Sequence, residues 1–192
     1  MNIRLISGMF KNHKITAPNS RQTHPMSERA RNAIFNAIQQ KIPNSEILDA
    51  FAGTGALGLE AISRGAKSVI FIEKNRLAQK ILSENLKITE KNSEAGEAKL
   101  IRTSISGWLN STESQFHLGE IEELPSFDIV FADPPYYDPQ FPTIKNLCNR
   151  LKPDGILVLS QPKELENFES EKLTLINEKL YSGAKILFFK VK

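Results

Sequence analysis

The stretch ILDAFAGTGALGLEA, residues 47–61, decides the fold of this 192-residue chain. An apolar run that ends at Asp49 predicts a buried strand, and a helical pattern begins at Ala56. The turn between them carries the pattern G-x-G-x-x-G, formed by Gly53, Gly55 and Gly58. A strand, a glycine-rich turn and a helix in this order are typical of the first βαβ unit of a nucleotide-binding sheet.

The remaining chain alternates between short apolar runs and helical patterns, which predicts an α/β fold with a parallel sheet covered on both faces. The expected strands are 47–49, 68–73, 98–102, 127–132 and 155–160. The expected helices are 56–64, 75–90, 105–109 and 141–151. The last two expected strands, 172–180 and 185–190, have only 181–184 between them. No crossover helix fits there, so these two strands should form an antiparallel hairpin.

The front of the chain has a different pattern. Two short strands are expected at 3–6 and 14–16, followed by a helix from about Ser27, a favourable N-cap, to Gln40. The predicted buried face of this helix consists of Ala30, Ala33, Ile34, Ala37 and Ile38. We interpret residues 1–41 as an extension on a sheet domain of residues 42–192, together forming one compact unit.

Charge is distributed unevenly along the chain. Residues 1–41 hold seven basic residues and one acid, whereas the remainder holds 18 basic and 21 acidic residues, for a net charge of +3. A basic end on a mildly acidic body indicates an anionic partner, most simply nucleic acid. Charge alone does not distinguish such a surface from a solvated basic flank.

Composition argues against several other classes of protein. Cys148 is the only cysteine, so no intramolecular disulfide is expected; its apolar neighbours place it in the core, and a reducing cytoplasm is the natural location. The apolar runs are too short to cross a bilayer, and polar breaks near Arg4 do not fit a signal peptide. No His/Cys cluster suggests a metal site.

The glycine turn fits two classes of ligand. Glu73 follows Gly53 by twenty positions, the spacing at which an acid binds a ribose hydroxyl in dinucleotide sites. Asp49, four positions before Gly53, would repel a pyrophosphate but suits the ammonium of S-adenosylmethionine, directly or through water. The terminal hairpin, and the lack of a second mononucleotide-binding half, also favour S-adenosylmethionine.

A second motif, DPPY, follows the apolar strand 127–132 and consists of Asp133, Pro134, Pro135 and Tyr136. Ligands bind outside the carboxyl ends of parallel strands, so this motif should share one crevice with Asp49 and Glu73. The prolines lack N–H groups, which leaves the Asp133 and Pro134 carbonyls free as acceptors. Acceptors that hold an exocyclic amine, and a ring that stacks on its base, are what methylation of a nucleobase nitrogen requires.

At this point the sequence resembles the RsmD-type 16S ribosomal RNA guanine-N2 methyltransferases. The similarity extends over almost the whole chain, in the segments IRLISGMFKNHKI, HPMSERARNAIFN, LDAFAGTGALGLEAISRGA, VIFIEKN, FDIVFADPPY and LKPDGILVLS. The resemblance implies a class I S-adenosylmethionine-dependent fold: a Rossmann-like seven-stranded sheet with an antiparallel C-terminal hairpin and a small N-terminal hairpin and helix.

The resemblance also implies roles for individual residues. The DPPY residues would be catalytic. Cofactor contacts would come from Asp49, Phe51, Gly53, Thr54, Gly55, Glu73, Lys74 and Ser104. Contacts to RNA phosphates would come from Arg4, Lys11, Lys14, Arg29 and Arg31. The expected partner is small-subunit ribosomal RNA or its particle, and the expected state is a monomer.

The chain departs from the family pattern at three places. His24 stands where the family typically has Arg, Ser104 where an Asp or Asn often contacts adenine, and Ser160 or Gln161 where a Glu is usual. Two other functions stay open. An adenine-N6 methyltransferase would use the same DPPY chemistry, although a DNA enzyme would normally need a separate recognition domain. A non-catalytic RNA-binding module is the second alternative, and the presence of all three acids argues against it.

Overall fold

A computed structural model describes residues 1–18, 26–181 and 183–192. Arg21 and His24, which contributed to the charge count and to the family comparison, lie outside these ranges. The strands are β1 (Asn2–Arg4), β2 (Lys14–Thr16), β3 (Glu46–Asp49), β4 (Ser68–Ile72), β5 (Glu97–Ile101), β6 (Phe127–Ala132), β7 (Leu151–Pro162), β8 (Leu173–Tyr181) and β9 (Ala184–Val191). The α-helices are α1 (Glu28–Ile38), α2 (Ala56–Ser63), α3 (Arg76–Glu90), α4 (Ile105–His117) and α5 (Phe141–Leu147).

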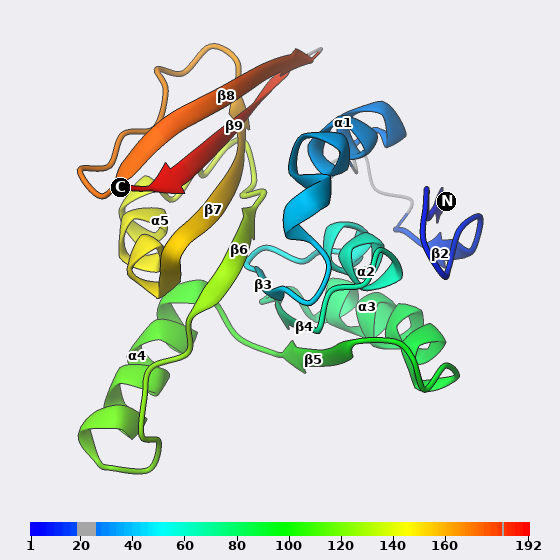
Figure 1. The fold of residues 1–192 in the computed structure, drawn as a ribbon, viewed down its shortest axis with the longest axis horizontal. Helices are drawn as coiled ribbons and strands as arrows, with labels where there is room; N and C mark the ends of the chain where they lie inside the picture. The colour runs from blue at the N-terminus through cyan, green and yellow to red at the C-terminus, as the bar shows by residue number, and fades with distance from the viewer. Residues whose placement is uncertain (19–25, 182) are drawn as a thin grey trace.

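Seven of these strands form one sheet in the order β5-β4-β3-β6-β7-β9-β8. Strands β3 to β7 pair in parallel, whereas β9 is antiparallel to both β7 and β8. The predicted C-terminal hairpin is therefore confirmed, and the reversed strand lies between β7 and the edge strand β8 (Figure 1). This arrangement is the seven-stranded sheet that the sequence indicated.

Helices cover both faces of the sheet, as Figure 1 shows. One apolar core joins α1, α2 and α3 to one face, with Phe35, Leu59 and Leu82 among its buried side chains. A second core joins α4 and α5 to the other face, where Trp108 and Ile144 are buried. The sheet is therefore packed on both faces, and the loops at the ends of its strands are supported from both sides.

The N-terminal segment packs onto α2 and α3 rather than standing apart from them. Ile3, Leu5 and Phe10 are buried in the same core as α2. The buried Glu60 carboxylate of α2 accepts hydrogen bonds from the backbone N–H groups of Ile6, at 2.6 Å, and Ser7, at 3.0 Å. Backbone groups of this segment therefore find their partners on the sheet domain, and the two parts share one interior.

Helix α1 buries a face that overlaps the predicted one but is rotated from it, since Ala30, Ile34 and Ile38 are buried as expected. Its buried residues are Ala30, Arg31, Ile34, Phe35 and Ile38, whereas Ala37 is exposed. Arg31, Ile34, Phe35 and Ile38 follow the i, i+3, i+4, i+7 spacing of a single helical face. The packing of the aromatic Phe35 against Phe131 of β6, with ring centroids 5.7 Å apart, fixes this rotation of the helix.

Other element boundaries also differ from the sequence expectation, most clearly in α4, α5 and β7. Helix α4 continues to His117, and the Thr112 hydroxyl in its second half is buried and donates to the carbonyls of Trp108 and Leu109. Helix α5 ends at Leu147, a short 3-10 turn follows, and β7 already begins at Leu151. The turn expected before Gly155 is present, since Asp154 has a φ of 62°. It forms an irregularity within β7, which continues to pair with β6 on both sides of it.

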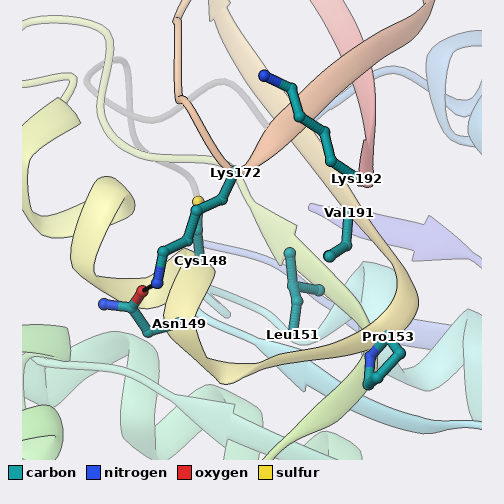
Figure 2. A pocket seen from close by; sticks show the side chains of 7 residues that line it. All are labelled: Cys148, Asn149, Leu151, Pro153, Lys172, Val191 and Lys192. Atoms are coloured by element: carbon teal, nitrogen blue, oxygen red, sulfur yellow. Dashed lines mark hydrogen bonds between the residues drawn. The ribbon is translucent and has the colours of Figure 1, made fainter.

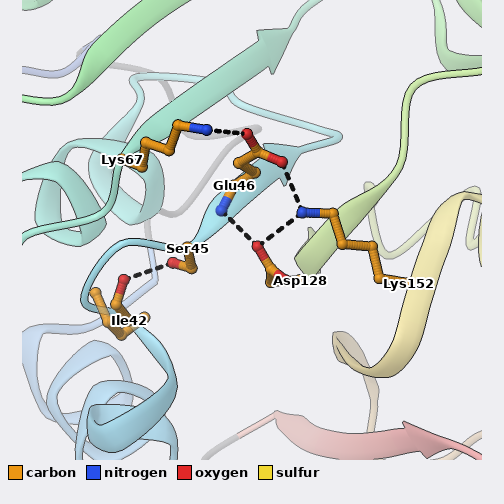
Figure 3. Close-up of polar contacts among 6 residues, drawn as sticks. All are labelled: Ile42, Ser45, Glu46, Lys67, Asp128 and Lys152. Atoms are coloured by element: carbon orange, nitrogen blue, oxygen red, sulfur yellow. Dashed lines mark hydrogen bonds and ion pairs between the residues drawn. The ribbon is translucent and has the colours of Figure 1, made fainter.

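Charged side chains form a network at the amino ends of the parallel strands, here called the amino edge of the sheet. The glycine turn lies at the other end, the carboxyl edge. Glu46 of β3 accepts from Lys67 at 2.7 Å and from Lys152 at 2.6 Å, and Lys152 also reaches Asp128 of β6 at 3.2 Å (Figure 3). These lysines lower the pKa of Glu46 to about 2. The network links β3, β6 and β7 where their strands begin and leaves the carboxyl edge free for ligands.

A pocket of about 300 Å³ lies at this same amino edge, between Leu151 and Lys172 (Figure 2). Cys148 lines it, but the thiol donates to the Ile144 carbonyl and burial raises its pKa to about 11. The cysteine is therefore protonated near neutral pH and unreactive, which confirms its interpretation as a core residue. Leu151 pairs with Phe127 at the start of β6, a full strand length away from Asp133.

Candidate active site

The glycine turn links the carboxyl end of β3 to the start of α2. Gly53 and Gly55 have φ values of 54° and 79°, a region that side chains with a Cβ rarely adopt. A Cβ built on Gly53 would meet no atom within 4 Å, so the turn is open to a ligand on that side. Gly58 serves packing instead, because a Cβ there would lie 2.2 Å from the ring of Phe71.

Asp49 ends β3 underneath this turn and is 2% exposed. Its Oδ2 accepts from the backbone N–H of Gly58 at 3.0 Å, in the first turn of α2. Since the N-cap residue Gly55 has no side chain to offer, Asp49 satisfies this helix N–H from outside the helix. One carboxylate oxygen is thus engaged by the protein, and the other is not used by a described residue.

Burial raises the pKa of Asp49 to about 7, opposed by the Gly58 hydrogen bond and reinforced by the charges of Asp133 and Glu73. These three acids follow three neighbouring strands, β6, β3 and β4. Because both other acids raise the pKa of Asp49, the three carboxylates lie close enough to repel one another at the carboxyl ends of these strands, where the sequence predicts a common crevice. A crevice lined in this way suits a cationic ligand and opposes a pyrophosphate.

Glu73 holds the glycine turn in place from the end of β4. Its Oε2 accepts from the N–H of Gly53 at 2.8 Å, and its Oε1 accepts from the N–H of Asn75 at 2.6 Å. Each carboxylate oxygen can accept more than one hydrogen bond, so both retain capacity for a ligand hydroxyl. The carboxylate therefore lies where the G-x-G-x-x-G spacing places an acid, directly against the glycine turn.

The other predicted cofactor residues have varied environments. Phe51 is partly buried against the second core, Lys74 is exposed after β4, and the Thr54 carbonyl accepts from Asn85 at 2.9 Å. Ser104 is the N-cap of α4, and its Oγ accepts from the N–H of Gly107 at 3.1 Å. The Ser104 hydroxyl is thus partly committed to helix capping in this structure.

The DPPY motif follows β6 at the same carboxyl edge. The structure gives the Asp133 and Pro134 carbonyls no hydrogen-bond partner among the residues that it describes, whereas the Pro135 carbonyl accepts from Asp138. Burial raises the pKa of Asp133, and a hydrogen bond from Ser160 opposes that rise. Tyr136 is 46% exposed, and its phenol oxygen lies 3.1 Å from the Ser160 hydroxyl.

Hydrogen-bond acceptors and an open aromatic ring thus occur together at this edge. A carboxylate and two carbonyls without a partner among the described residues can accept the hydrogens of an exocyclic amine, and a half-exposed tyrosine ring can stack on the attached base. Tyr137, which is 84% exposed, extends the aromatic surface outward. The arrangement can bind a flat, amine-bearing ring next to the crevice of Asp49.

The predicted RNA contacts do not behave alike. Lys11, Lys14 and Arg29 are exposed, and Arg4 is exposed in an ion pair with Glu28 at 3.0 Å. Arg31 is 2% exposed, and its Nη2 donates to the Arg4 carbonyl at 3.1 Å. The prediction that Arg31 contacts phosphates is therefore wrong for this structure, because the side chain forms part of the α1 interface.

Sequence reasoning did not identify two residues that the structure brings to the site. The sequence marked Ser160 only as a departure from the family pattern, and it gave Asn85 no role beyond a polar position in a long helix. Asn85 falls at i+3 from the buried Leu82 and directly before the buried Leu86, so a polar residue on the core face was the available signal.

Within the described ranges, no helix is long and apolar enough to cross a membrane. No group of three or more His, Cys, Asp or Glu side chains converges in a way that could hold a metal ion among those same residues.

The fold is the Rossmann-like fold of class I methyltransferases, a parallel sheet with a reversed terminal hairpin. The glycine turn beside two strand-end acids and the DPPY motif are the sequence features expected at the site of such an enzyme. The sequence model of the family described as Conserved hypothetical protein 95 matches residues 3–190. The chain belongs to this family. Relatives named Ribosomal RNA small subunit methyltransferase D identify the family as the RsmD family.

Comparisons with individual proteins agree with this assignment. The chain is 34% identical over 180 residues to the Ribosomal RNA small subunit methyltransferase D of Haemophilus influenzae, covering 92% of this chain and 88% of that protein. It is 30% identical to the protein of the same name from Buchnera aphidicola, with 93% and 87% covered. The solved structure of the candidate methyltransferase yhhF from Escherichia coli superposes with a TM-score of 0.81 and 26% identity, covering 100% and 99% of the two chains.

Proposed function

We propose that this enzyme transfers a methyl group from S-adenosylmethionine to the exocyclic N2 of a guanine in small-subunit ribosomal RNA. The observation that carries the proposal is the placement of Asp133 and the half-exposed Tyr136 near the buried Asp49, together with two carbonyls that have no hydrogen-bond partner among the described residues. The relatives from Haemophilus influenzae and Buchnera aphidicola are named as small-subunit ribosomal RNA methyltransferases, which supports the choice of RNA.

The residues present fit S-adenosylmethionine. The turn is open at Gly53, and the buried Asp49 has a pKa raised to about 7 by burial and by its acidic neighbours. An ammonium and a sulfonium would relieve that repulsion, whereas a dinucleotide would increase it. Glu73 offers its remaining acceptor capacity to a ribose, and Asp49 offers its unengaged oxygen to the ammonium. The bound cofactor supplies an electrophilic methyl group.

The chain's own residues would act on the base. The Asp133 carboxylate and the Pro134 carbonyl accept the two hydrogens of the amine and turn its lone pair out of conjugation with the ring. Tyr136 stacks on the base and sets the angle of approach, so that much of the rate comes from orientation. As the nitrogen forms its bond to the methyl carbon, the carbon–sulfur bond would break and the leaving group would depart as a neutral thioether; the methylated amine becomes acidic, and Asp133 is placed to take one proton. A carboxylate with a raised pKa is a better acceptor for that proton.

The proposal is tested with labelled cofactor, unmethylated small-subunit RNA and partly assembled particles, followed by nucleoside mapping. We expect N2-methylguanine, and N6-methyladenine in the product would contradict the choice of base. Asp133→Ala should abolish transfer while leaving cofactor binding measurable. An active Asp133→Ala protein would contradict the role of that carboxylate, and absence of cofactor binding by the natural protein would favour a non-catalytic RNA-binding module.

A further inference from the structure

Ser160 lies beside the DPPY motif on the neighbouring strand. The parallel register pairs Ala132 of β6 with Leu159 of β7, so the next residues of the two strands, Asp133 and Ser160, lie at the same level of the sheet. Ser160 is 2% exposed, and its Oγ is 3.1 Å from the phenol oxygen of Tyr136. A small buried hydroxyl therefore stands between the two side chains that would handle the base.

The single hydrogen of this hydroxyl determines the direction of the hydrogen bonds. Ionised Asp133 can only accept, and it lies level with Ser160 in the sheet, so the Ser160 hydroxyl is placed to donate to its carboxylate and lower its pKa. When the Ser160 hydrogen is directed to Asp133, Tyr136 donates its own hydrogen to the Ser160 oxygen across the 3.1 Å contact, in which either hydroxyl can be the donor. The chain of donors thus runs from Tyr136 through Ser160 to Asp133.

We infer that Ser160 is a positioning residue for methyl transfer, whose hydroxyl orients the Asp133 carboxylate and the Tyr136 ring together. This inference rests on the function proposed above. Loop residues at the end of β6 need such an anchor, because the described structure gives the Asp133 and Pro134 carbonyls no hydrogen-bond partner. Asp49 approaches Asp133 from β3, but as another acid it repels the carboxylate and cannot anchor it.

Removing the hydroxyl should affect the chemical step more than binding. In Ser160→Ala, Asp133 loses the hydrogen bond that opposes the rise of its pKa, and the Tyr136 ring loses its tether. We expect kcat to fall about tenfold, corresponding to about 1.4 kcal/mol at the transition state, and its acid limb to move to higher pH. The affinity for S-adenosylmethionine should stay within about twofold of the natural protein, since Ser160 contacts no predicted cofactor residue.

Two further variants separate positioning from general packing. Ser160→Thr keeps the hydroxyl and should recover most of kcat, whereas Tyr136→Phe keeps the ring and the Ser160–Asp133 contact and should leave the acid limb in place. A Ser160→Ala protein with unchanged kcat and pH profile would overturn the inference. So would a Ser160→Thr protein as impaired as Ser160→Ala.

A measurement without turnover distinguishes this inference from the proposed function. Carbon-13 titration of the Asp133 carboxyl should show a higher pKa in Ser160→Ala than in the natural protein. Equal pKa values would overturn the hydrogen-bond chain even if the enzyme is active. A raised pKa in a protein that methylates no RNA would confirm the hydrogen-bond chain, reject the proposed function, and overturn the positioning role with it.

Discussion

Arg4 and Lys14 stand directly opposite each other across the N-terminal hairpin, on its outward face. Ile3 and Ile15, which alternate with them, point into the core. Like charges opposite each other destabilise a strand pair, and the ion pair of Arg4 with Glu28 offsets this only in part. An anionic partner bound at this face would relieve the repulsion between these two adjacent cations.

The first prediction concerns Lys14. Lys14→Gln should weaken RNA binding several-fold and lower the salt dependence of the affinity by about one phosphate contact. Because the change removes a repulsion with Arg4, it should leave thermal stability unchanged or slightly higher. Lys145→Gln on α5 is the matched control, since it removes one exposed charge from the opposite face of the sheet. Equal losses of affinity in the two variants would contradict a specific RNA contact at the hairpin and would indicate a solvated basic surface instead.

A second prediction separates Arg29 from Arg31, which are neighbours on one helix with opposite burial. Desolvation lowers the pKa of Arg31, while Glu60 and Glu28 raise it. Arg31→Glu would place an acid against the fully buried Glu60 and should lower the free energy of unfolding by about 3 kcal/mol or more. Arg29→Glu should change it by less than about 0.5 kcal/mol and weaken RNA binding instead. Denaturant unfolding of both proteins checks this, and similar stabilities would contradict the structure of the α1 interface.

A third prediction links the hairpin to the cofactor site through Asn85. Its side chain accepts from the Thr16 N–H at 2.8 Å and donates to the Thr16 and Thr54 carbonyls, both at 2.9 Å. Asn85→Ala should lower stability by about 1–3 kcal/mol and also weaken cofactor binding, because Thr54 lies within the glycine turn. Calorimetric titration with the cofactor measures the second effect.

Thr112→Ala serves as the control for Asn85. Thr112 is also buried and hydrogen-bonded, but it lies in α4 on the other face of the sheet. It should lower stability by a similar amount without changing cofactor affinity. If both variants weaken cofactor binding equally, the effect of Asn85 is general destabilisation and not support of the turn.

A fourth prediction follows from the pKa of about 7 at Asp49. The unfolded chain has an ordinary aspartate pKa near 4, so between these values the folded state binds the additional proton. This group therefore makes the free protein less stable as pH rises from about 4 to 7. Cofactor affinity should change in the opposite sense and decrease as pH falls below 7, because a cation binds the ionised form. Asp49→Asn should bind weakly with no such pH dependence, and a natural protein whose affinity is flat from pH 5.5 to 8 would contradict the assignment.

Much of this could be predicted from the sequence because strand periodicity and glycine spacing are local. The positions of β3 to β6 along the chain, the antiparallel hairpin and the placement of Asp49, Glu73 and Asp133 at strand ends all depend on such signals. The rotation of α1 could not be predicted, because the tertiary contact of Phe35 with Phe131 decides it. The start of β7 was misplaced because Pro153 and Gly155 give a turn signal, which the sheet absorbs as an irregularity within a paired strand.

The same limit applies inside the site. A motif predicts which residues meet a ligand, but not which residues hold the motif. Asp49 and Glu73 were assigned to the cofactor alone, yet both also bind backbone N–H groups of the turn and of α2. The support from Ser160 and Asn85 comes from residues 24 and 31 positions away from the groups they contact, Tyr136 and Thr54, which is beyond the reach of a periodicity argument.

The hydrogen bonds of Glu60 determine the order in which parts of the chain can fold during synthesis. Ile6 and Ser7 leave the ribosome first, but their partner follows 54 and 53 residues later. Until α2 has emerged, the basic leading segment has no surface on which to fold. The segment proposed to recognise RNA is therefore finished only when the cofactor turn is finished, and a nascent chain cannot present one without the other.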